Sequence, residues 1–464
     1  DGHGPLVTVL SRDQRTLRTL AVDPASGATR VLEEQRDPWW VEIVPGAWCR
    51  TASGALVSPY ESGDTRRLRV GGETVTPVGL QLGEVLGTQG ESVLFTAGED
   101  PTEEHVWRYA PGQGCLRISD TPGSHRAAMG GDTLVLDSLT RDGQEVSVVR
   151  VAHAAETEAG SGLRGAVRKR GFIASRAEEP SVLPRPFFLS LGDRQLRSAL
   201  FLPSWYEPGA PGTAPLPVLL DPYSGPGARQ VMRARHWSTC VSQWFAEQGF
   251  AVLVTDGRGT PGRGPAWEKA VRGDQLTPVL ADQIDALRTA ARSRPYLDLG
   301  RVAIRGWSFG GILATAAVLR HPDVFHAAVA GAAPSDQRLY DTHWKERFLG
   351  HPDEEPENYD RCSLLAEAPL LRRPLLLVHG TTDDNVAFAN TLRLSAALLA
   401  AGREHTVLPL PGQSHMVTDE AAAEALLGFQ LRFLRDALAG RADAARTEPA
   451  DHGAGRSQAD PVRG

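Results

Sequence analysis

The chain has 464 residues, of which 23% are charged, and its formal net charge at pH 7 is −7. A charge this mild provides no basic surface for nucleic acid or for an anionic membrane. No apolar run approaches the roughly 18 residues that a membrane-spanning helix needs. The length allows two or three domains. We therefore expect a multidomain globular protein with no nucleic-acid and no membrane partner.

The four cysteines are widely spaced and show neither a C-x-x-C pair nor a zinc-ligand pattern. We expect buried free thiols in a reducing cytoplasm, and neither a metal nor a cofactor. The chain begins at Asp1 rather than at a methionine, so a secretory signal ahead of this start stays open. Only 3 of the 49 basic residues are lysines, a bias that suggests a GC-rich bacterial genome.

Residues 1–160 are predicted to be all-β, because short strand-like runs alternate with glycine and aspartate turns. Similar segment ends recur about every 41–46 residues, the length of one four-stranded propeller blade. An irregular β-sandwich is the alternative. Three to four blades fit here, whereas propellers close with roughly four to eight. We therefore expect a partial β-propeller from a longer parent chain, followed by a linker at residues 161–185.

Residues 186–438 are predicted to form an α/β-hydrolase domain with a mostly parallel, doubly wound sheet. Residues 306–310 read Gly-Trp-Ser-Phe-Gly and match the G-x-S-x-G motif. The apolar residues 302–304 predict a short buried strand before the motif, and the small residues 311–319 predict a helix after it. Strand, tight turn, serine and helix together indicate a nucleophile elbow, with Ser308 as the nucleophile.

Candidate partners for the serine follow in the chain order Ser, Asp, His, which is that of α/β hydrolases. A predicted strand at 375–380 leads into a loop with Asp383 and Asp384, and a strand at 405–410 precedes His415. Histidine can take the serine proton near neutral pH, and an aspartate orients the imidazole. Spacing alone does not separate the two aspartates. Asp383 is preferred, partly from the resemblance given below, and Asp384 is the alternative.

Other histidines have structural interpretations. His379 directly follows a strand and reads as a turn residue, and His321 and His326 flank the end of the elbow helix. His415 differs because an apolar-patterned helix follows it, at about residues 418–438, as expected for the last loop of a hydrolase.

Five separated motifs occur in an order that resembles the prolyl oligopeptidase class of serine peptidases, and most of all its dipeptidyl peptidase IV subfamily. The resemblance covers about residues 186–438 and implies a hydrolase whose active site is covered by a preceding β-propeller. The motifs are Asp-Pro-Tyr-Ser-Gly-Pro at 221–226, Asp-Gly-Arg-Gly at 256–259, Gly-Trp-Ser-Phe-Gly-Gly at 306–311, Tyr-Asp-Thr with Glu-Arg-Phe-Leu-Gly at 340–350, and His-Gly-Thr-Thr-Asp-Asp-Asn-Val at 379–386.

Carried over residue by residue, the resemblance makes Ser308 the nucleophile, Asp383 the acid and His415 the base. It makes the Tyr223 hydroxyl and the Phe309 backbone N–H the oxyanion donors. Fixed donors at that place stabilise the charge of a tetrahedral intermediate. The alternative for Tyr223 is an aromatic residue at a strand end that only packs on its neighbours.

The resemblance also implies a primary pocket formed by Phe309, Tyr340, Trp344 and Val386, with Asn385 holding the substrate backbone. The chain departs from the family pattern in two places. It has Trp344 where the family usually has a tyrosine, and Asp336-Gln337 where the family usually has an aspartate and an aromatic residue. An amide in place of an aromatic wall changes both shape and polarity. The preference for proline over alanine or a larger residue therefore stays open.

We expect a serine peptidase that cleaves short peptides through an acyl-enzyme, in the manner of dipeptidyl peptidases, and a homodimer is among its expected states. An esterase or acylaminoacyl peptidase would use the same triad with another pocket. A non-catalytic propeller protein that binds partners is the alternative from another class, and the complete triad argues against it. Residues 439–464, rich in Ala, Gly, Asp, Arg and Pro, are predicted to be a disordered tail.

Overall fold

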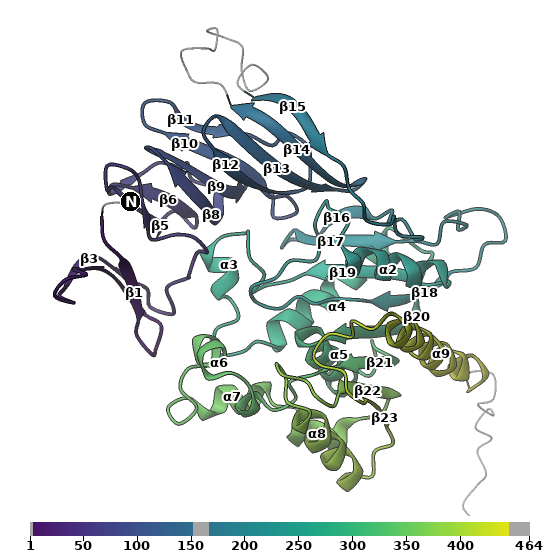
Figure 1. The fold of residues 1–464 in the computed structure, drawn as a ribbon. Helices are drawn as coiled ribbons and strands as arrows, with labels where there is room; N and C mark the ends of the chain where they lie inside the picture. The colour runs from purple at the N-terminus through teal and green to yellow at the C-terminus, as the bar shows by residue number, and fades with distance from the viewer. Residues whose placement is uncertain (1–2, 152–166, 445–464) are drawn as a thin grey trace, which may run out of the picture.

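The computed structural model describes residues 3–151 and 167–444. An all-β part comes first, and an α/β part with one large sheet follows it (Figure 1). The predicted fold class, an α/β hydrolase preceded by an all-β region, is confirmed. None of the helices in these ranges combines the length and the apolarity of a membrane span.

Within these ranges, the all-β part consists of one three-stranded and three four-stranded antiparallel sheets. Each strand pairs with its neighbour in sequence, which is the arrangement of propeller blades. The strands are β1 (Leu6–Leu10), β2 (Thr16–Val22) and β3 (Thr29–Arg36) in the first sheet; β4 (Cys49–Arg50), β5 (Leu56–Glu61), β6 (Arg66–Val70) and β7 (Glu73–Thr74) in the second; β8 (Gln81–Gln89), β9 (Ser92–Gly98), β10 (His105–Ala110) and β11 (Gly114–Arg117) in the third; and β12 (Ser124–Gly130), β13 (Thr133–Thr140), β14 (Gly143–Val151) and β15 (Val167–Ile173) in the fourth.

Strand β15 lies inside the stretch predicted as a linker at residues 161–185. Its sequence, Val-Arg-Lys-Arg-Gly-Phe-Ile, lacks the alternation of apolar and polar residues that marks a half-buried strand. It pairs with β14 through its backbone, with Val167 opposite Val151. Backbone pairing therefore completes the fourth sheet where the side chains give no signal.

The α/β part is built on an eight-stranded sheet with the order β16-β17-β19-β18-β20-β21-β22-β23. The pairs β16–β17 and β17–β19 are antiparallel, and the other neighbours are parallel. The carboxyl ends of the parallel strands therefore meet at one edge, where sites of such sheets form. The strands are β16 (Phe187–Leu191), β17 (Leu196–Phe201), β18 (Leu216–Leu220), β19 (Ala251–Asp256), β20 (Leu297–Trp307), β21 (Ala327–Gly331), β22 (Leu375–Gly380) and β23 (Thr406–Leu410).

Helices cover both faces of this sheet (Figure 1). Phe245 of α2 and Leu434 of α9 pack with Val252 and Val329 on one face. Helices α4, α5 and α8 pack on the other face, in the larger core. The helices are α2 (Trp237–Glu247), α3 (Pro265–Lys269), α4 (Thr277–Arg292), α5 (Phe309–Arg320), η2 (Gln337–Leu339), α6 (Thr342–Leu349), α7 (Pro356–Cys362), η3 (Leu365–Leu370), α8 (Ala389–Ala400) and α9 (Glu420–Ala444).

Helix α9 continues to Ala444, past residue 439, where the predicted tail begins. Alanine and arginine, which occur in this stretch, favour helix. The remainder of the predicted tail, residues 445–464, lies outside the described residues.

Helix α6 is tied to the β part at both of its faces. Arg12 pairs with Glu346 at 2.8 Å, and Arg347 pairs with Glu42 at 3.0 Å. The ring of Phe348 lies 5.2 Å from that of Trp40 in an edge-on contact. The position of α6 therefore depends on its contacts with the β part, which precedes it in the chain.

The two parts also meet through Glu103 and Glu104, which directly precede β10. Glu104 lies 2.7 Å from Arg229, and Glu103 lies 3.2 Å from Arg233. The arginines come from the loop before α2, which no local pattern could place opposite β10.

Candidate active site

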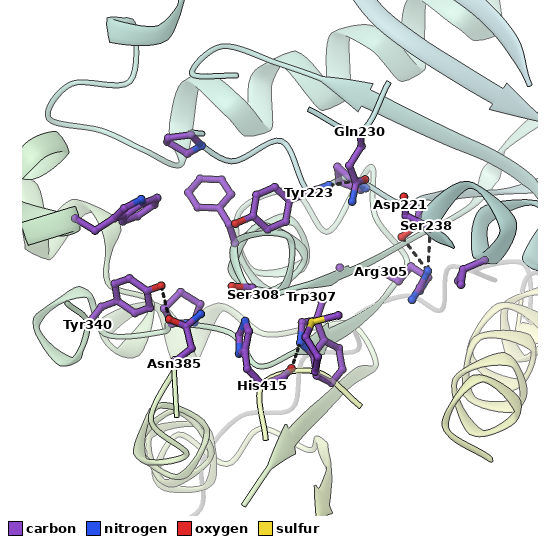
Figure 2. A pocket seen from close by; sticks show the side chains of 18 of the residues that line it. Asp221, Tyr223, Gln230, Ser238, Arg305, Trp307, Ser308, Tyr340, Asn385 and His415 are labelled. Atoms are coloured by element: carbon purple, nitrogen blue, oxygen red, sulfur yellow. Dashed lines mark hydrogen bonds and ion pairs between the residues drawn. The ribbon is translucent and has the colours of Figure 1, made fainter. Parts of the chain in front are cut away.

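Ser308 occupies the sharp turn between β20 and α5. Its φ of 57° and ψ of −116° are rare for a residue with a side chain. The turn is held by hydrogen bonds from Ser308 N–H to the Gly331 carbonyl (2.8 Å) and from Gly311 N–H to the Ser308 carbonyl (2.9 Å). Such a turn exposes the nucleophile, and Figure 2 shows Ser308 between Tyr223 and His415.

The glycines of the motif allow three close approaches of the backbone. A Cβ on Gly306 would lie 2.2 Å from the Gly310 oxygen, and one on Gly310 would lie 2.4 Å from the Pro222 oxygen. A Cβ on Gly311 would lie 2.3 Å from the Gly331 oxygen. Because real Cβ atoms do not approach so closely, only glycine fits at these positions.

Asp383 holds His415 from the loop after β22. Its Oδ2 lies 2.8 Å from Nδ1 of His415, which leaves the other ring nitrogen to act as a base. Its Oδ1 accepts the backbone N–H groups of Asn385 (2.9 Å) and Val386 (2.8 Å). The Asp383 side chain is fully buried. Three donors therefore fix this carboxylate.

Asp384 contacts a different partner. Its Oδ1 accepts a hydrogen bond from Ser414 Oγ at 2.5 Å, which lowers the pKa of this exposed carboxyl. The neighbouring Thr382 hydroxyl donates to the Gln413 carbonyl at 3.0 Å. Asp384 thus ties the loop of the acid to the loop of the base, while Asp383 contacts His415 itself.

His379, at the end of β22, supports the acid from behind. Its Nε2 lies 2.8 Å from the Val386 carbonyl and 3.2 Å from Asp383 Oδ2, and its Nδ1 lies 2.7 Å from Thr391 Oγ1. Burial lowers the pKa of His379, so the ring is neutral near pH 7. Sequence reasoning assigned it only a turn. The spacing of four residues between His379 and Asp383 was the feature of the sequence that could have indicated this contact.

Tyr223, in the loop after β18, lines the same cavity as Ser308. Burial first, and then the nearby Tyr340, raise the pKa of Tyr223, so its phenol stays protonated and can donate. Phe309 is the first residue of α5, where N–H groups have no intrahelical acceptor. Its ring lies 6.2 Å from that of Tyr223.

An ion pair joins the loop of Tyr223 to the strand of Ser308. Arg305 Nη1 lies 3.0 and 2.9 Å from the two carboxylate oxygens of Asp221 (Figure 2). Ser242 of α2 donates to the same carboxylate at 2.8 Å. Sequence reasoning named neither Asp221 nor Arg305 as a site residue. Their contact sets the distance between the nucleophile and the proposed oxyanion donor.

These residues open onto a cavity of about 380 Å³. One end carries an aromatic corner, in which Tyr340 and Trp344 lie with ring centroids 5.7 Å apart at 69°. The Tyr340 hydroxyl donates to Asn385 Oδ1 at 2.9 Å, which orients that amide (Figure 2). Seven of the predicted site residues line the cavity: Tyr223, Ser308, Phe309, Tyr340, Trp344, Asn385 and His415.

Two expectations about the pocket need correction. Val386, expected in its wall, is fully buried and is not among the lining residues. Its backbone holds Asp383 and His379 instead. Gln337, expected to replace an aromatic wall, turns its Nε2 to the carbonyls of Pro334 (2.8 Å) and Cys362 (3.0 Å), beneath the cavity.

Comparison with known proteins agrees with this geometry. Residues 236–441 match the prolyl oligopeptidase family. Dipeptidyl peptidase 8 of Mus musculus is 32% identical over 250 residues, which are 53% of this chain and 28% of the mouse protein. A probable dipeptidyl-aminopeptidase B of Talaromyces marneffei is 34% identical over 205 residues, or 43% of this chain and 22% of the fungal protein.

The fold is shared with a solved structure, dipeptidyl peptidase 4 of Porphyromonas gingivalis. The TM-score is 0.82 at 23% identity, over 93% of this chain and 61% of the other. The matched regions thus span about a quarter of the length of these curated relatives. Residues 236–441 are thus similar to the prolyl oligopeptidase family of serine peptidases, and the matched parts of the chain are similar to dipeptidyl peptidases.

Proposed function

We propose that the chain is the catalytic part of a serine peptidase that cleaves short peptides in the manner of dipeptidyl peptidases. The observation that carries the proposal is the 2.8 Å contact between buried Asp383 and His415, in the cavity onto which Ser308 opens from its strained turn. Together these residues have the parts that nucleophilic acyl transfer needs.

In the first half of the reaction, Ser308 Oγ attacks the scissile carbonyl while His415 takes its proton. Asp383 keeps the imidazole in the required tautomer and stabilises the imidazolium that forms. The imidazolium then gives its proton to the leaving amine, and the carbon–nitrogen bond breaks. The product is an ester of Ser308 with the first part of the peptide.

Charge develops on the carbonyl oxygen during the attack. The Tyr223 hydroxyl and the Phe309 N–H act as its two donors, and a fixed donor of this kind contributes roughly 3–4 kcal/mol to the transition state. In the second half, water deprotonated by His415 attacks the ester and releases Ser308. The same donors serve both halves.

The proposal includes the cellular setting. All four cysteines are free, and burial raises the pKa of the Cys115 and Cys362 thiols to about 11. Free, protonated thiols are typical of a reducing compartment, which supports the cytoplasm. Self-association as a homodimer rests on the family resemblance, and sedimentation velocity tests it.

Ser308→Ala tests the central assignment. We expect turnover of a dipeptide anilide to fall by several orders of magnitude, as it does when a member of a triad is lost. A serine-directed phosphonate should label the parent protein at Ser308 and leave the variant unlabelled. Ser190→Ala, at an exposed position of β16, is the matched control. Full activity in Ser308→Ala, or labelling at another serine, would refute the proposal.

A further inference from the structure

The floor of the cavity carries a buried lysine, Lys345 of α6. Only 2% of its surface is exposed, yet it is among the residues that line the cavity. Its Nζ lies 4.6 Å from the ring centroid of Trp344 and 5.3 Å from that of Tyr340. The amine therefore sits at the aromatic corner that receives the substrate residue before the scissile bond.

The lysine lacks a counter-charge. Its hydrogen bond goes to Gln275 Oε1 at 3.2 Å, and it forms no ion pair with any described residue. An ammonium group can donate three hydrogen bonds, and a buried one needs an opposite charge. A substrate carboxylate that entered the cavity would supply the hydrogen-bond acceptors and the opposite charge.

The surroundings of Lys345 are polar and incompletely satisfied. Gln275 Nε2 and Gln337 Oε1 are both buried and have no hydrogen-bond partner among the described residues. Both residues also contact Cys362: the backbone N–H of Gln275 points to its sulfur at 3.4 Å, and the side-chain amide of Gln337 donates to its carbonyl at 3.0 Å. Neither glutamine lines the cavity, whereas Lys345 does. A pocket for proline would need apolar walls only, so a lysine beside the rings of Tyr340 and Trp344 indicates a different preference.

We propose that Lys345 is a specificity-determining residue that makes the primary pocket accept glutamate or aspartate before the scissile bond. The inference rests on the proposed function and names its substrate class. The aromatic rings of Tyr340 and Trp344 flank the aliphatic part of such a side chain, and its carboxylate meets the ammonium group. Tyr340 lies near Ser308 in Figure 2, with Asn385 beside it.

Burial lowers the pKa of Lys345 to about 7. The titratable neighbours of Lys345 are Tyr340, just before α6, and Cys362 of α7. Asp274 lies on the far side of the thiol, with its Oδ1 4.0 Å from Cys362 Sγ. Burial raises the pKa of both the phenol and the thiol, so neither loses its proton near pH 7. Lys345 is thus charged below about pH 7 and neutral above it. A substrate glutamate stays ionised throughout, since its pKa is about 4.3.

The test compares Ala-Glu and Ala-Gln p-nitroanilides, which differ in charge and hardly in shape. We expect kcat/KM for the glutamate substrate to exceed that for the glutamine substrate by at least about tenfold at pH 6, the factor that corresponds to about 1.4 kcal/mol. The ratio should fall as the pH rises through about 7. Any pH effect on the acyl-transfer step is common to the two substrates and cancels in the ratio.

Lys345→Met should bring the ratio close to one at every pH, because it removes the charge and keeps much of the side-chain volume. Lys169→Met, which removes an exposed lysine of β15, is the matched control. Labelling of Ser308 by the phosphonate reports whether the variant is folded. If Lys345→Met is unfolded, the test is the unsubstituted protein. A glutamate-to-glutamine ratio of kcat/KM that does not fall through about pH 7 then overturns the role of Lys345.

The outcomes separate this inference from the proposed function. Cleavage of Ala-Gln and Ala-Ala anilides without a preference for glutamate, or a preference that persists in folded Lys345→Met, overturns the role of Lys345 alone. Failure to cleave any of the anilides, together with no labelling of Ser308, overturns the proposed function.

Discussion

At the scale of single residues, the proposed chemistry depends on groups whose protons are held in place. Tyr223→Phe removes one hydroxyl and little volume. If that hydroxyl acts only in the transition state, kcat should fall by about 10²–10³-fold with a small change in KM. Steady-state kinetics with a dipeptide anilide measure both constants. An unchanged kcat would mean that Tyr223 only packs against Phe309.

His379 acts through Asp383 and is therefore a positioning residue. His379→Leu removes the ring nitrogen that lies 3.2 Å from the Asp383 carboxylate. Without this neighbour the carboxylate should interact more strongly with the imidazolium of His415. We expect the acidic limb of the kcat/KM profile to move to higher pH and kcat to fall about tenfold. A purely structural role would lower the active fraction and leave the limb unmoved.

At the scale of elements, the packing of α5 against its neighbours requires glycine in the elbow. In Gly310→Ala the added Cβ would lie 2.4 Å from the Pro222 oxygen and push the loop of Tyr223 away. We expect a loss of roughly 1–3 kcal/mol in stability, as for an overpacked core, and a fall in kcat. Thermal unfolding and anilide turnover measure the two effects.

Gly428, within helix α9, is the matched control for the elbow glycine. A Cβ there would meet only the end of the Arg432 side chain, at 3.5 Å. Alanine in a helix interior is favoured over glycine by roughly 0.5–1 kcal/mol, so Gly428→Ala should raise the melting temperature. Equal effects of the two substitutions would show that the elbow tolerates a side chain.

At the scale of the whole molecule, a buried ion pair between the parts fixes the β part against the hydrolase. Arg66 of β6 lies 2.7 Å from Glu268 of α3, and both side chains are at most 9% exposed. Burial opposes the charge of Arg66, but Glu268, Glu42 and Glu61 outweigh it and raise its pKa. Removing Glu268 would leave the buried Arg66 with the more exposed Glu61, at 3.1 Å, as its remaining ion-pair partner.

Glu268→Gln should therefore destabilise the protein by about 3–5 kcal/mol, whereas the double variant Arg66→Met with Glu268→Met should recover much of the loss. Denaturant unfolding followed by two probes, one in each part, measures the stability and the coupling of the parts. Equal losses in the single and double variants would show that the pair contributes no more than its packing.

The sequence by itself determined the fold class and the resemblance to a family. The elbow at 306–310 is a local pattern of strand, tight turn and helix, so it could be recognised from the sequence alone. Strands of a buried parallel sheet appear in the sequence as continuous apolar runs, so the order of the hydrolase elements could also be predicted. Ser308 and His415 could be named because each follows a strand at the same edge of the sheet, whereas spacing left the acid open between Asp383 and Asp384.

Only the tertiary structure decided which side chains meet across distant segments. It placed Asp383 rather than Asp384 against His415, turned Val386 away from the pocket, and put the apparent turn residue His379 behind the acid. It also brought Lys345 and Gln275 together, 70 positions apart. Such contacts depend on how helices and loops pack, and they leave no local period or spacing in the sequence. For the same reason the sequence predicted a linker where β15 lies, because backbone pairing with β14 holds this strand.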